Sequence, residues 1–479
     1  MKRKMLAILL VACASLGCKA QPQKELFEPV RFEDGTVVDR DEAGLAALLD
    51  ADPVWTDTIT DRNDTLLIVK HTGAFVRLRL EGLPEGGHID RIDLVPMYGD
   101  IAGAQVLTID LGQDIPASGE FVRWMAFAPK PLSALAVIVH ESASLLSARI
   151  AETDLKAGTA YRWDARCLHP SEMDAGMTAR PLMQTPMPGI AAGEYSGITH
   201  IGGDNYAVVD DNLPGSGILF FRIPIDETGT VGTVSMRPTE GASTGKKRDS
   251  EGIAFVPDKG CFYVSSEKHQ EIREYDLRGM ATGAGLQVPE DLSSKSIASN
   301  RGFEALTFHA GTGLFWTTTE SPLKRDTFLP RILRLQSFDR DGNPAGRFLY
   351  QTGNPSISDS SGAQAYVFGV PALAALDDGR LIVLEREVYV PKGGMLTKLR
   401  DSFSRMDLYV VDPAGDPAGI LRKAPLSSFR TGALDLANFE GMCLGPTLPD
   451  GRRCLVLIAD SQNGSGGLID EYVKVILLR

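Results

Sequence analysis

A short motif recurs along the second half of the chain, and this recurrence limits the folds that the chain can adopt. Its clearest copy is residues 438–444 (Asn-Phe-Glu-Gly-Met-Cys-Leu), and related stretches centre on Ser196, Glu251, Glu304 and Ala372. With Glu440 as the last marker, the copies lie roughly 55, 53, 68 and 68 residues apart, which is the spacing of blade-sized repeats. Each copy begins a short apolar segment, a turn with glycine follows, and a second apolar segment ends in an acidic residue.

These second segments are rich in valine, isoleucine and aromatic residues, a composition typical of strands buried on both faces. Their terminal acids are Asp210 and Asp211, Glu267, Glu320, Glu385 and Asp460. Burial alone would not select a carboxylate at one place in five copies, because an unpaired buried charge is costly. A radial arrangement brings these acids to one end of a central channel. We therefore predict an all-β chain in which residues 190–479 form a β-propeller with five visible blades and room for a degenerate sixth.

The residues before the propeller follow a different pattern. Segments 76–80 and 107–111 alternate strictly between apolar and polar residues, as half-buried antiparallel strands do, and residues 24–157 are predicted to form a small β-sandwich-like accessory domain. Residues 158–189 contain several prolines and little periodicity, which indicates a linker or wrapping segment. This segment is a candidate for the strand that closes the propeller ring, because few residues follow Asp460.

The first 18 residues have the pattern of an export signal. A basic start precedes a short apolar stretch and then Ser15-Leu16-Gly17-Cys18, which indicates secretion with lipid attachment at Cys18. We expect a periplasmic or cell-surface protein anchored by this lipid. The cysteines beyond the signal are Cys167, Cys261, Cys443 and Cys454; an even number in an exported chain permits disulfides without fixing their pairing.

The overall charge excludes one class of partner. The chain carries a formal charge of −13, whereas nucleic-acid binding requires basic patches. An anionic substrate would need local basic residues or a metal ion.

The candidate site lies where the two strands of each repeat meet. Glu251, Glu304 and Glu440 each open a first strand, and in a hairpin this end lies beside the acid that closes the second strand. Converging carboxylates repel one another unless cations lie among them, and oxygen ligands of this kind suit Ca²⁺ or another hard divalent cation. We therefore expect these three glutamates, with Arg301 and Arg386, to be catalytic and the strand-end acids to bind metal. The alternative is that the glutamates and arginines form buried ion pairs between blades.

The same residues resemble the esterase-like phytase family, which consists of exported bacterial proteins. The motifs that carry the resemblance are 250–254 (Ser-Glu-Gly-Ile-Ala), 300–304 (Asn-Arg-Gly-Phe-Glu), 384–386 (Leu-Glu-Arg), 438–441 (Asn-Phe-Glu-Gly) and 459–463 (Ala-Asp-Ser-Gln-Asn). The resemblance implies a metal-assisted phosphoric-ester hydrolase, phytase-like or phosphodiesterase-like, with a small phosphorylated substrate. The first repeat departs from the pattern, since Ser196 stands where others have glutamate. We expect a monomer; the alternative function is a non-catalytic propeller lipoprotein that binds a ligand or partner.

Overall fold

The computed structural model describes residues 24–479 except residues 43, 52–53, 62–63, 142–143, 172, 244, 299–300, 433–434 and 462–469. The expected signal and Cys18 lie outside the described residues. The chain divides into two compact units, Met1–Cys167 and Leu168–Arg479. No helix among the described residues is long and apolar enough to cross a bilayer.

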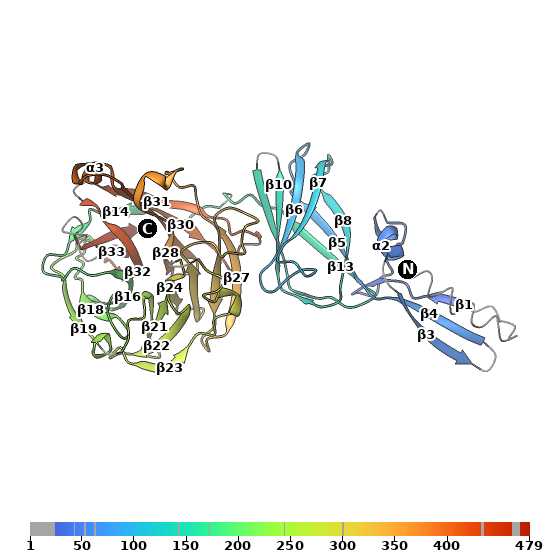
Figure 1. Ribbon diagram of the computed structural model, residues 1–479, viewed down its shortest axis with the longest axis horizontal. Helices are drawn as coiled ribbons and strands as arrows, with labels where there is room; N and C mark the ends of the chain where they lie inside the picture. Colours follow the sequence, from blue (N-terminus) through green and yellow to red (C-terminus); the bar gives the residue numbers. More distant parts are fainter. Residues whose placement is uncertain are drawn as a thin grey trace. The chain divides into compact units, whose positions relative to one another are not determined.

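The first unit is a β-sandwich built from two four-stranded sheets. One sheet has the order β11-β10-β6-β7 and the other β2-β13-β5-β8 (Figure 1). Its strands are β2 (Arg31–Phe32), β5 (Ala74–Glu81), β6 (His88–Pro96), β7 (Leu107–Asp114), β8 (Phe121–Phe127), β10 (Leu135–Glu141), β11 (Ser144–Ile150) and β13 (Thr159–Arg166). Alternation packs one face of each sheet inward: Val76 and Leu78 of β5 share a core with Val137 and Val139 of β10.

Smaller elements complete this unit. They are β1 (Lys24–Phe27), β3 (Val54–Asp61) and β4 (Asp64–His71) in a three-stranded sheet, the pair β9 (Pro131–Leu132) and β12 (Thr153–Asp154), and α2 (Leu45–Ala51). The unit extends to Cys167 rather than ending at residue 157, because β13 pairs in parallel with β5, from Ala160 opposite Phe75 onward. Residues 159–166 therefore belong to the sandwich and not to a linker.

The second unit contains five antiparallel sheets, the five blades of the predicted propeller (Figure 1). Blade 1 is β16 (Tyr195–Gly202), β17 (Asn205–Asp210), β18 (Ile218–Arg222) and β19 (Ser235–Pro238); blade 2 is β20 (Ser250–Val256), β21 (Cys261–Ser266), β22 (Glu271–Asp276) and β23 (Ala281–Gly285). Blade 3 is β24 (Phe303–His309), β25 (Leu314–Thr319), β26 (Ile332–Phe338) and β27 (Pro344–Gln351); blade 4 is β28 (Ala363–Ala375), β29 (Leu381–Pro391), β30 (Phe403–Val411) and β31 (Ala424–Gly432). The helix α3 (Met395–Asp401) joins β29 to β30, and short 3-10 turns lie at Glu240–Ser243, Glu290–Leu292 and Ser360–Gly362.

Blade 5 closes the ring with strands from both ends of the unit. It contains β32 (Asn438–Thr447), β33 (Arg453–Asp460) and β34 (Tyr472–Leu478) together with β14 (Ala179–Pro181) and β15 (Thr185–Pro186). Ala179 lies opposite Leu478, so the expectation that the segment before residue 190 supplies a closing strand is confirmed. The described residues form no sixth blade.

The first strands of the five blades surround the centre, each beside the next from β16 to β32 and back to β16. Glycine allows this close approach: a Cβ on Gly252 would lie 2.5 Å from the carbonyl oxygen of Glu304 in the next blade. The apolar cores between blades combine leucine, alanine and methionine with the β-branched and aromatic residues that defined the repeats. All four described cysteines are buried free thiols, so none of the disulfides that the sequence permits is present among the described residues.

Candidate functional site

A β-bulge interrupts the first strand of every blade at the motif itself. The register shifts between Phe303 and Ala305 in blade 3 and between Phe439 and Gly441 in blade 5, which leaves Glu304 and Glu440 without a cross-strand partner. Corresponding shifts occur in blade 1, blade 2 and blade 4. A bulge bends the strand and redirects the side chain of its extra residue. The motif is therefore the sequence of a bulge that presents a side chain at one end of the channel.

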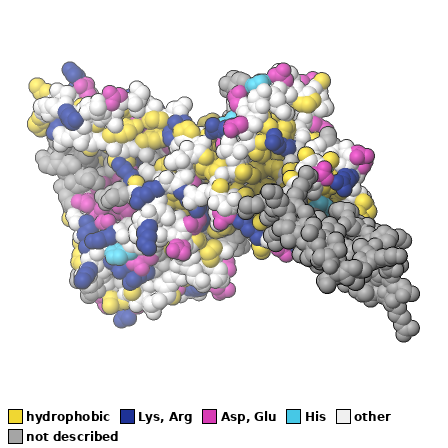
Figure 2. Space-filling view, turned by 45° about the vertical axis from the view of Figure 1, so that its right-hand side comes forward, with side chains coloured by type: hydrophobic (Ala, Val, Ile, Leu, Met, Phe, Trp, Pro, Cys, Tyr) yellow, Lys and Arg dark blue, Asp and Glu magenta, His cyan; other side chains and the backbone are white. Residues whose placement is uncertain are grey.

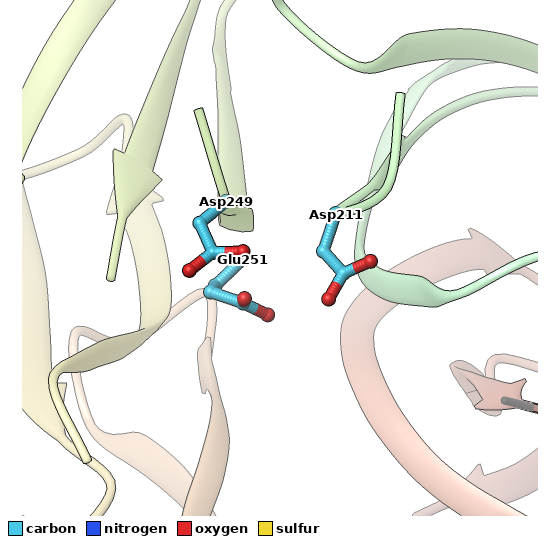
Figure 3. A group of neighbouring side chains, drawn as sticks. All are labelled: Asp211, Asp249 and Glu251. Carbon is cyan, nitrogen blue, oxygen red and sulfur yellow. The ribbon is translucent and has the colours of Figure 1, made fainter. Parts of the chain in front are cut away.

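Three carboxylates meet at the junction of blades 1 and 2. Asp211 follows β17, Asp249 precedes β20, and Glu251 lies in the bulge of β20; one oxygen from each lies within 4.8 Å of the other two. In Figure 3 the Asp211 side chain points across toward the other two. Asp249 adopts the left-handed φ of 59°, uncommon for a residue other than glycine. Figure 2 shows acidic side chains gathered on the propeller, with lysine and arginine side chains beside them.

Burial and mutual repulsion oppose simultaneous ionisation of Asp211, Glu251 and Glu304. Burial, followed by the nearby carboxylate of Glu194, raises the pKa of Asp211 to about 9. Burial also raises the pKa of Glu251 well above its usual range, and the charges of Glu440 and Asp211 act in the same direction. Burial also raises the pKa of Glu304 well above its usual range, and the charge of Glu251 adds to this shift. Such a group favours binding either protons or a cation.

Two arginines share one glutamate between them. Glu320 Oε2 accepts a hydrogen bond from Arg301 Nη1 at 2.5 Å, and its Oε1 accepts one from Arg386 Nη2 at 2.5 Å. Arg386 also forms an ion pair with Glu440, which Asn438 Nδ2 reaches at 2.8 Å. The Arg386 side chain is only 4% exposed whereas that of Arg301 is 33% exposed. Arg301 is therefore the arginine with access to a solute, and Arg386 holds three blades together.

Two further strand-end acids, Glu267 and Asp460, lie near this group. Glu267 accepts a hydrogen bond from the backbone N–H of Gly302 at 3.0 Å. Burial raises the pKa of Glu267, the hydrogen bond from Gly302 opposes this shift, and the charge of Glu320 adds to it. Asp460 is 1% exposed and lies near Asp211. Asp210 is also buried, and it accepts a hydrogen bond from the backbone N–H of Asn212 at 2.9 Å.

Glu385, expected to bind metal, lies apart from this group. Its carboxylate accepts hydrogen bonds from the Tyr350 hydroxyl at 2.5 Å, Lys423 Nζ at 2.6 Å and the Gly353 N–H at 2.8 Å. These partners tie blade 4 to blade 3, so the structure supports the ion-pair alternative at this position. The register instead makes Glu387 the counterpart of the other strand-end acids, since it follows Arg386, the partner of Gly369 at the bulge.

Glu387 is also engaged locally. Its carboxylate accepts hydrogen bonds from the backbone of Ser356 and Ile357 and forms an ion pair with Arg405. Blade 4 therefore contributes Arg386 to the central cluster and no free carboxylate among the described residues. At the channel itself, Ser196, Glu304 and Glu440 line a cavity of about 10 Å³, which is close to the space that one water molecule requires.

A family model described as "Phytase-like: Esterase-like activity of phytase" matches residues 190–462. The chain belongs to this family. The match spans the propeller from before β16 through β33 and includes every residue of the cluster, and it confirms the resemblance stated from the motifs. Membership in the Phytase-like family supports hydrolase activity on esters. The sandwich lies outside the match.

Comparisons with other proteins add little to this Phytase-like assignment. Among curated proteins, none matches the chain. Solved structures with partial similarity include hydrazine synthase of Kuenenia stuttgartiensis (12% identity, 58% of each chain covered, TM-score 0.27) and the Swd1 β-propeller domain of Myceliophteria thermophila (10% identity, 61% of this chain and 99% of that chain, TM-score 0.27). A Bacteroides thetaiotaomicron protein of unknown function covers 90% of this chain and 99% of its own at 10% identity and TM-score 0.30.

Two acidic residues at this site, Asp249 and Glu194, were not predicted from the sequence as site residues. Asp249 immediately precedes the Ser250-Glu251 motif, so its proximity was available from the sequence. Glu194 lies in the segment that leads into β16 and affects Asp211 only because the chain folds back: Asp211 N–H donates to the Glu194 carbonyl at 3.0 Å. No local pattern indicates that contact.

Proposed function

We propose that this protein is a metal-assisted phosphoric-ester hydrolase that acts on a small phosphorylated molecule outside the cytoplasm. The observation that carries the proposal is the convergence of Asp211, Asp249 and Glu251, with one oxygen of each within 4.8 Å of the others, at the acidic end of the channel. The esterase-like family description supports the reaction class.

The residues at this junction fit a hard divalent cation. All three donors are carboxylate oxygens, the ligands that Ca²⁺ prefers. Asp211 Oδ1 is buried and has no hydrogen-bond partner among the described residues, an arrangement that costs free energy unless a cation or proton compensates it. Lys247 Nζ lies 3.8 Å from Asp249 Oδ1 and supplies a single positive charge against the three carboxylates.

We infer a division of roles within the cluster. Asp211, Asp249 and Glu251 would hold the metal ion, which when bound polarises a phosphoryl oxygen and lowers the pKa of a bound water. Arg301 is partly exposed, and its planar guanidinium group suits a phosphate oxygen pair. Glu320 orients Arg301 through its 2.5 Å hydrogen bond. The monomer and the absence of a nucleic-acid partner remain part of the proposal.

The assay of first choice measures release of phosphate or alcohol from aryl phosphates, phosphodiesters and phytate by the full chain. We expect turnover in Ca²⁺, loss of turnover in excess chelator, and recovery when Ca²⁺ is restored. The triple variant Asp211→Asn/Asp249→Asn/Glu251→Gln should be inactive under all conditions. Absence of turnover on every ester would favour the alternative, a propeller that binds a ligand or partner without chemistry.

Thermal unfolding tests metal binding independently of substrate choice. A ligand at 100 times its Kd stabilises the folded state by about 2.7 kcal/mol, so the Tm of the parent should rise with free Ca²⁺. The triple variant should lose this response, whereas Asp341→Asn, an exposed acid in a blade 3 turn, should keep it. A parent Tm that does not depend on Ca²⁺ would contradict the metal site.

Export and lipid attachment are proposed from the N-terminal residues alone. The export pattern and Cys18 predict that the protein is recovered from membranes after cell fractionation. Cys18→Ser should shift the protein to the soluble extracytoplasmic fraction and remove labelling by a radioactive fatty acid. Unchanged fractionation together with no labelling of the parent would contradict the anchor.

A further inference from the structure

Blade 4 carries an extension that the other blades lack. Its first two strands, β28 and β29, have 13 and 11 residues, whereas β24 and β25 of blade 3 have 7 and 6. The additional pairs run from Phe368 opposite Glu387 to Ala363 opposite Pro391. They lie beyond the Gly369–Arg386 pair at the acidic end of the blade. The extension therefore displays the helix that follows, α3, on the same end of the propeller as the candidate site.

Two apolar side chains at the start of α3 face solvent. Met395 is 63% exposed and Leu396 is 84% exposed, and no residue of α3 is buried. Adjacent exposed residues of this size are unusual because each loses favourable burial. Figure 1 shows α3 at the outer edge of the propeller, beside β31. The start of α3 thus presents two apolar side chains to solvent, and the helix buries none of its side chains in the core.

Basic residues lie close to this apolar tip of α3 in sequence or on the neighbouring strand β31. Lys392 precedes α3, Lys398 lies in its last turn, and Arg430 on β31 places its guanidinium group 3.9 Å from the ring centroid of Phe403. Among the residues described, no carboxylate forms an ion pair with any of these three. Arg400 is neutralised by Asp401 at 2.7 Å. The tip is therefore locally positive on a chain with a formal charge of −13.

We propose that the α3 tip, defined as Lys392, Met395, Leu396, Lys398 and Arg430, docks the acidic end of the propeller onto a bilayer surface that contains anionic lipids. An apolar pair flanked by cations matches the interfacial region, where apolar side chains insert and basic ones contact headgroups. Two side chains are too small for a stable protein interface, which buries at least about 1,000 Å². The proposal does not depend on the proposed hydrolase activity.

Vesicle cosedimentation of the full chain tests this proposal. Every variant carries Cys18→Ser, so that no attached lipid contributes to binding. The parent should bind phosphatidylcholine vesicles that contain phosphatidylglycerol, and bind pure phosphatidylcholine vesicles much less. Met395→Glu/Leu396→Glu should lower the partition coefficient by about tenfold or more, because it removes the apolar insertion and adds repulsion. Met183→Glu, at a 91% exposed methionine between β14 and β15, is the matched control and should bind as the parent does.

Two further measurements separate the outcomes. Lys392→Glu/Lys398→Glu should weaken binding to anionic vesicles, and added salt should reduce the difference from the parent. Unchanged far-UV circular dichroism of the exposed-site variants confirms that they fold. The proposal is overturned if the parent does not bind anionic vesicles, if it binds neutral vesicles equally well, or if the α3 variants bind as the parent does.

Discussion

Replacing Arg386 by methionine tests whether the buried centre of the propeller depends on a shared counter-ion. Arg386 lies on β29 and its guanidinium group contacts Glu320 of blade 3 at 2.5 Å and Glu440 of blade 5. All three side chains are at most 12% exposed. Methionine fills part of the same volume but carries no charge. The variant therefore removes the cation while leaving two buried carboxylates in place.

Removal of Arg386 leaves the two carboxylates with unequal numbers of compensating charged partners. Glu320 keeps its 2.5 Å hydrogen bond from Arg301, whereas Glu440 keeps, among the described residues, the 2.8 Å hydrogen bond from Asn438 alone. Breaking a buried ion pair by removal of one partner costs about 3–5 kcal/mol. We therefore expect a loss of about 3–5 kcal/mol in the free energy of unfolding, mainly from Glu440, rather than twice that amount.

The loss should depend on pH in a defined direction. Burial already raises the pKa of Glu440 although Arg386 opposes it, and without Arg386 this pKa rises further. A carboxyl with a folded-state pKa above its unfolded value destabilises the fold increasingly as pH rises above the unfolded pKa, and the full penalty is reached once pH exceeds the folded pKa. The penalty disappears below the unfolded pKa, which is about 4.3 for glutamate. The difference between parent and variant should thus be largest near neutral pH and shrink toward pH of about 4.

Urea unfolding, with amide exchange of propeller peptides as the signal, measures this difference separately from the sandwich. The double variant Arg386→Met/Glu440→Gln should recover part of the lost stability, because the stranded charge is gone. A loss below about 1 kcal/mol would refute the reasoning, since it would mean that the ion pair contributes no more than an exposed one. A loss of the expected size that did not change with pH would indicate altered packing instead.

Three further changes test the roles assigned to neighbouring residues. Gly252→Ala should lower the free energy of unfolding by about 1–3 kcal/mol, because its Cβ would lie 2.5 Å from the backbone of the next blade. A Cβ at Gly394 has no atom within 4 Å, so Gly394→Ala should be neutral; equal effects of the two changes would contradict close packing of the first strands around the channel. Glu385→Gln should lower the free energy of unfolding by about 3 kcal/mol, because Lys423 loses its charged partner. The Ca²⁺-dependent rise in Tm should stay unchanged, and its loss would show that Glu385 is a metal ligand after all. Glu304→Gln should abolish turnover, as expected of a catalytic glutamate, and should change the free energy of unfolding by no more than about 1 kcal/mol, because Glu304 forms no ion pair in the described part of the chain. A loss of about 3–5 kcal/mol in urea unfolding would mean that Glu304 has a structural role instead.

Several features of this protein follow from short stretches of sequence. Runs of valine, isoleucine and aromatic residues form strands, and glycine-containing turns join them, because these preferences depend on the backbone and its nearest neighbours. The spacing of the motifs was therefore sufficient to predict the five blades, and the alternation in segments 76–80 and 107–111 predicted the sandwich before them. It also predicted that Glu304 and Glu440 lie near one end of the channel, because a hairpin places its strand ends side by side.

Only the tertiary structure decided which carboxylates act together. Glu385 and Glu387 differ by two residues and face the same side of β29, so selecting the counterpart of Glu320 required the register at the bulge. Arg386 meets partners 66 and 54 residues away in sequence, on two other blades, and Asp211 meets Glu251 through the closure of neighbouring blades. These contacts arise when five similar sheets are arranged around an axis. A repeat can specify each sheet, but the distances between sheets depend on how all of them pack.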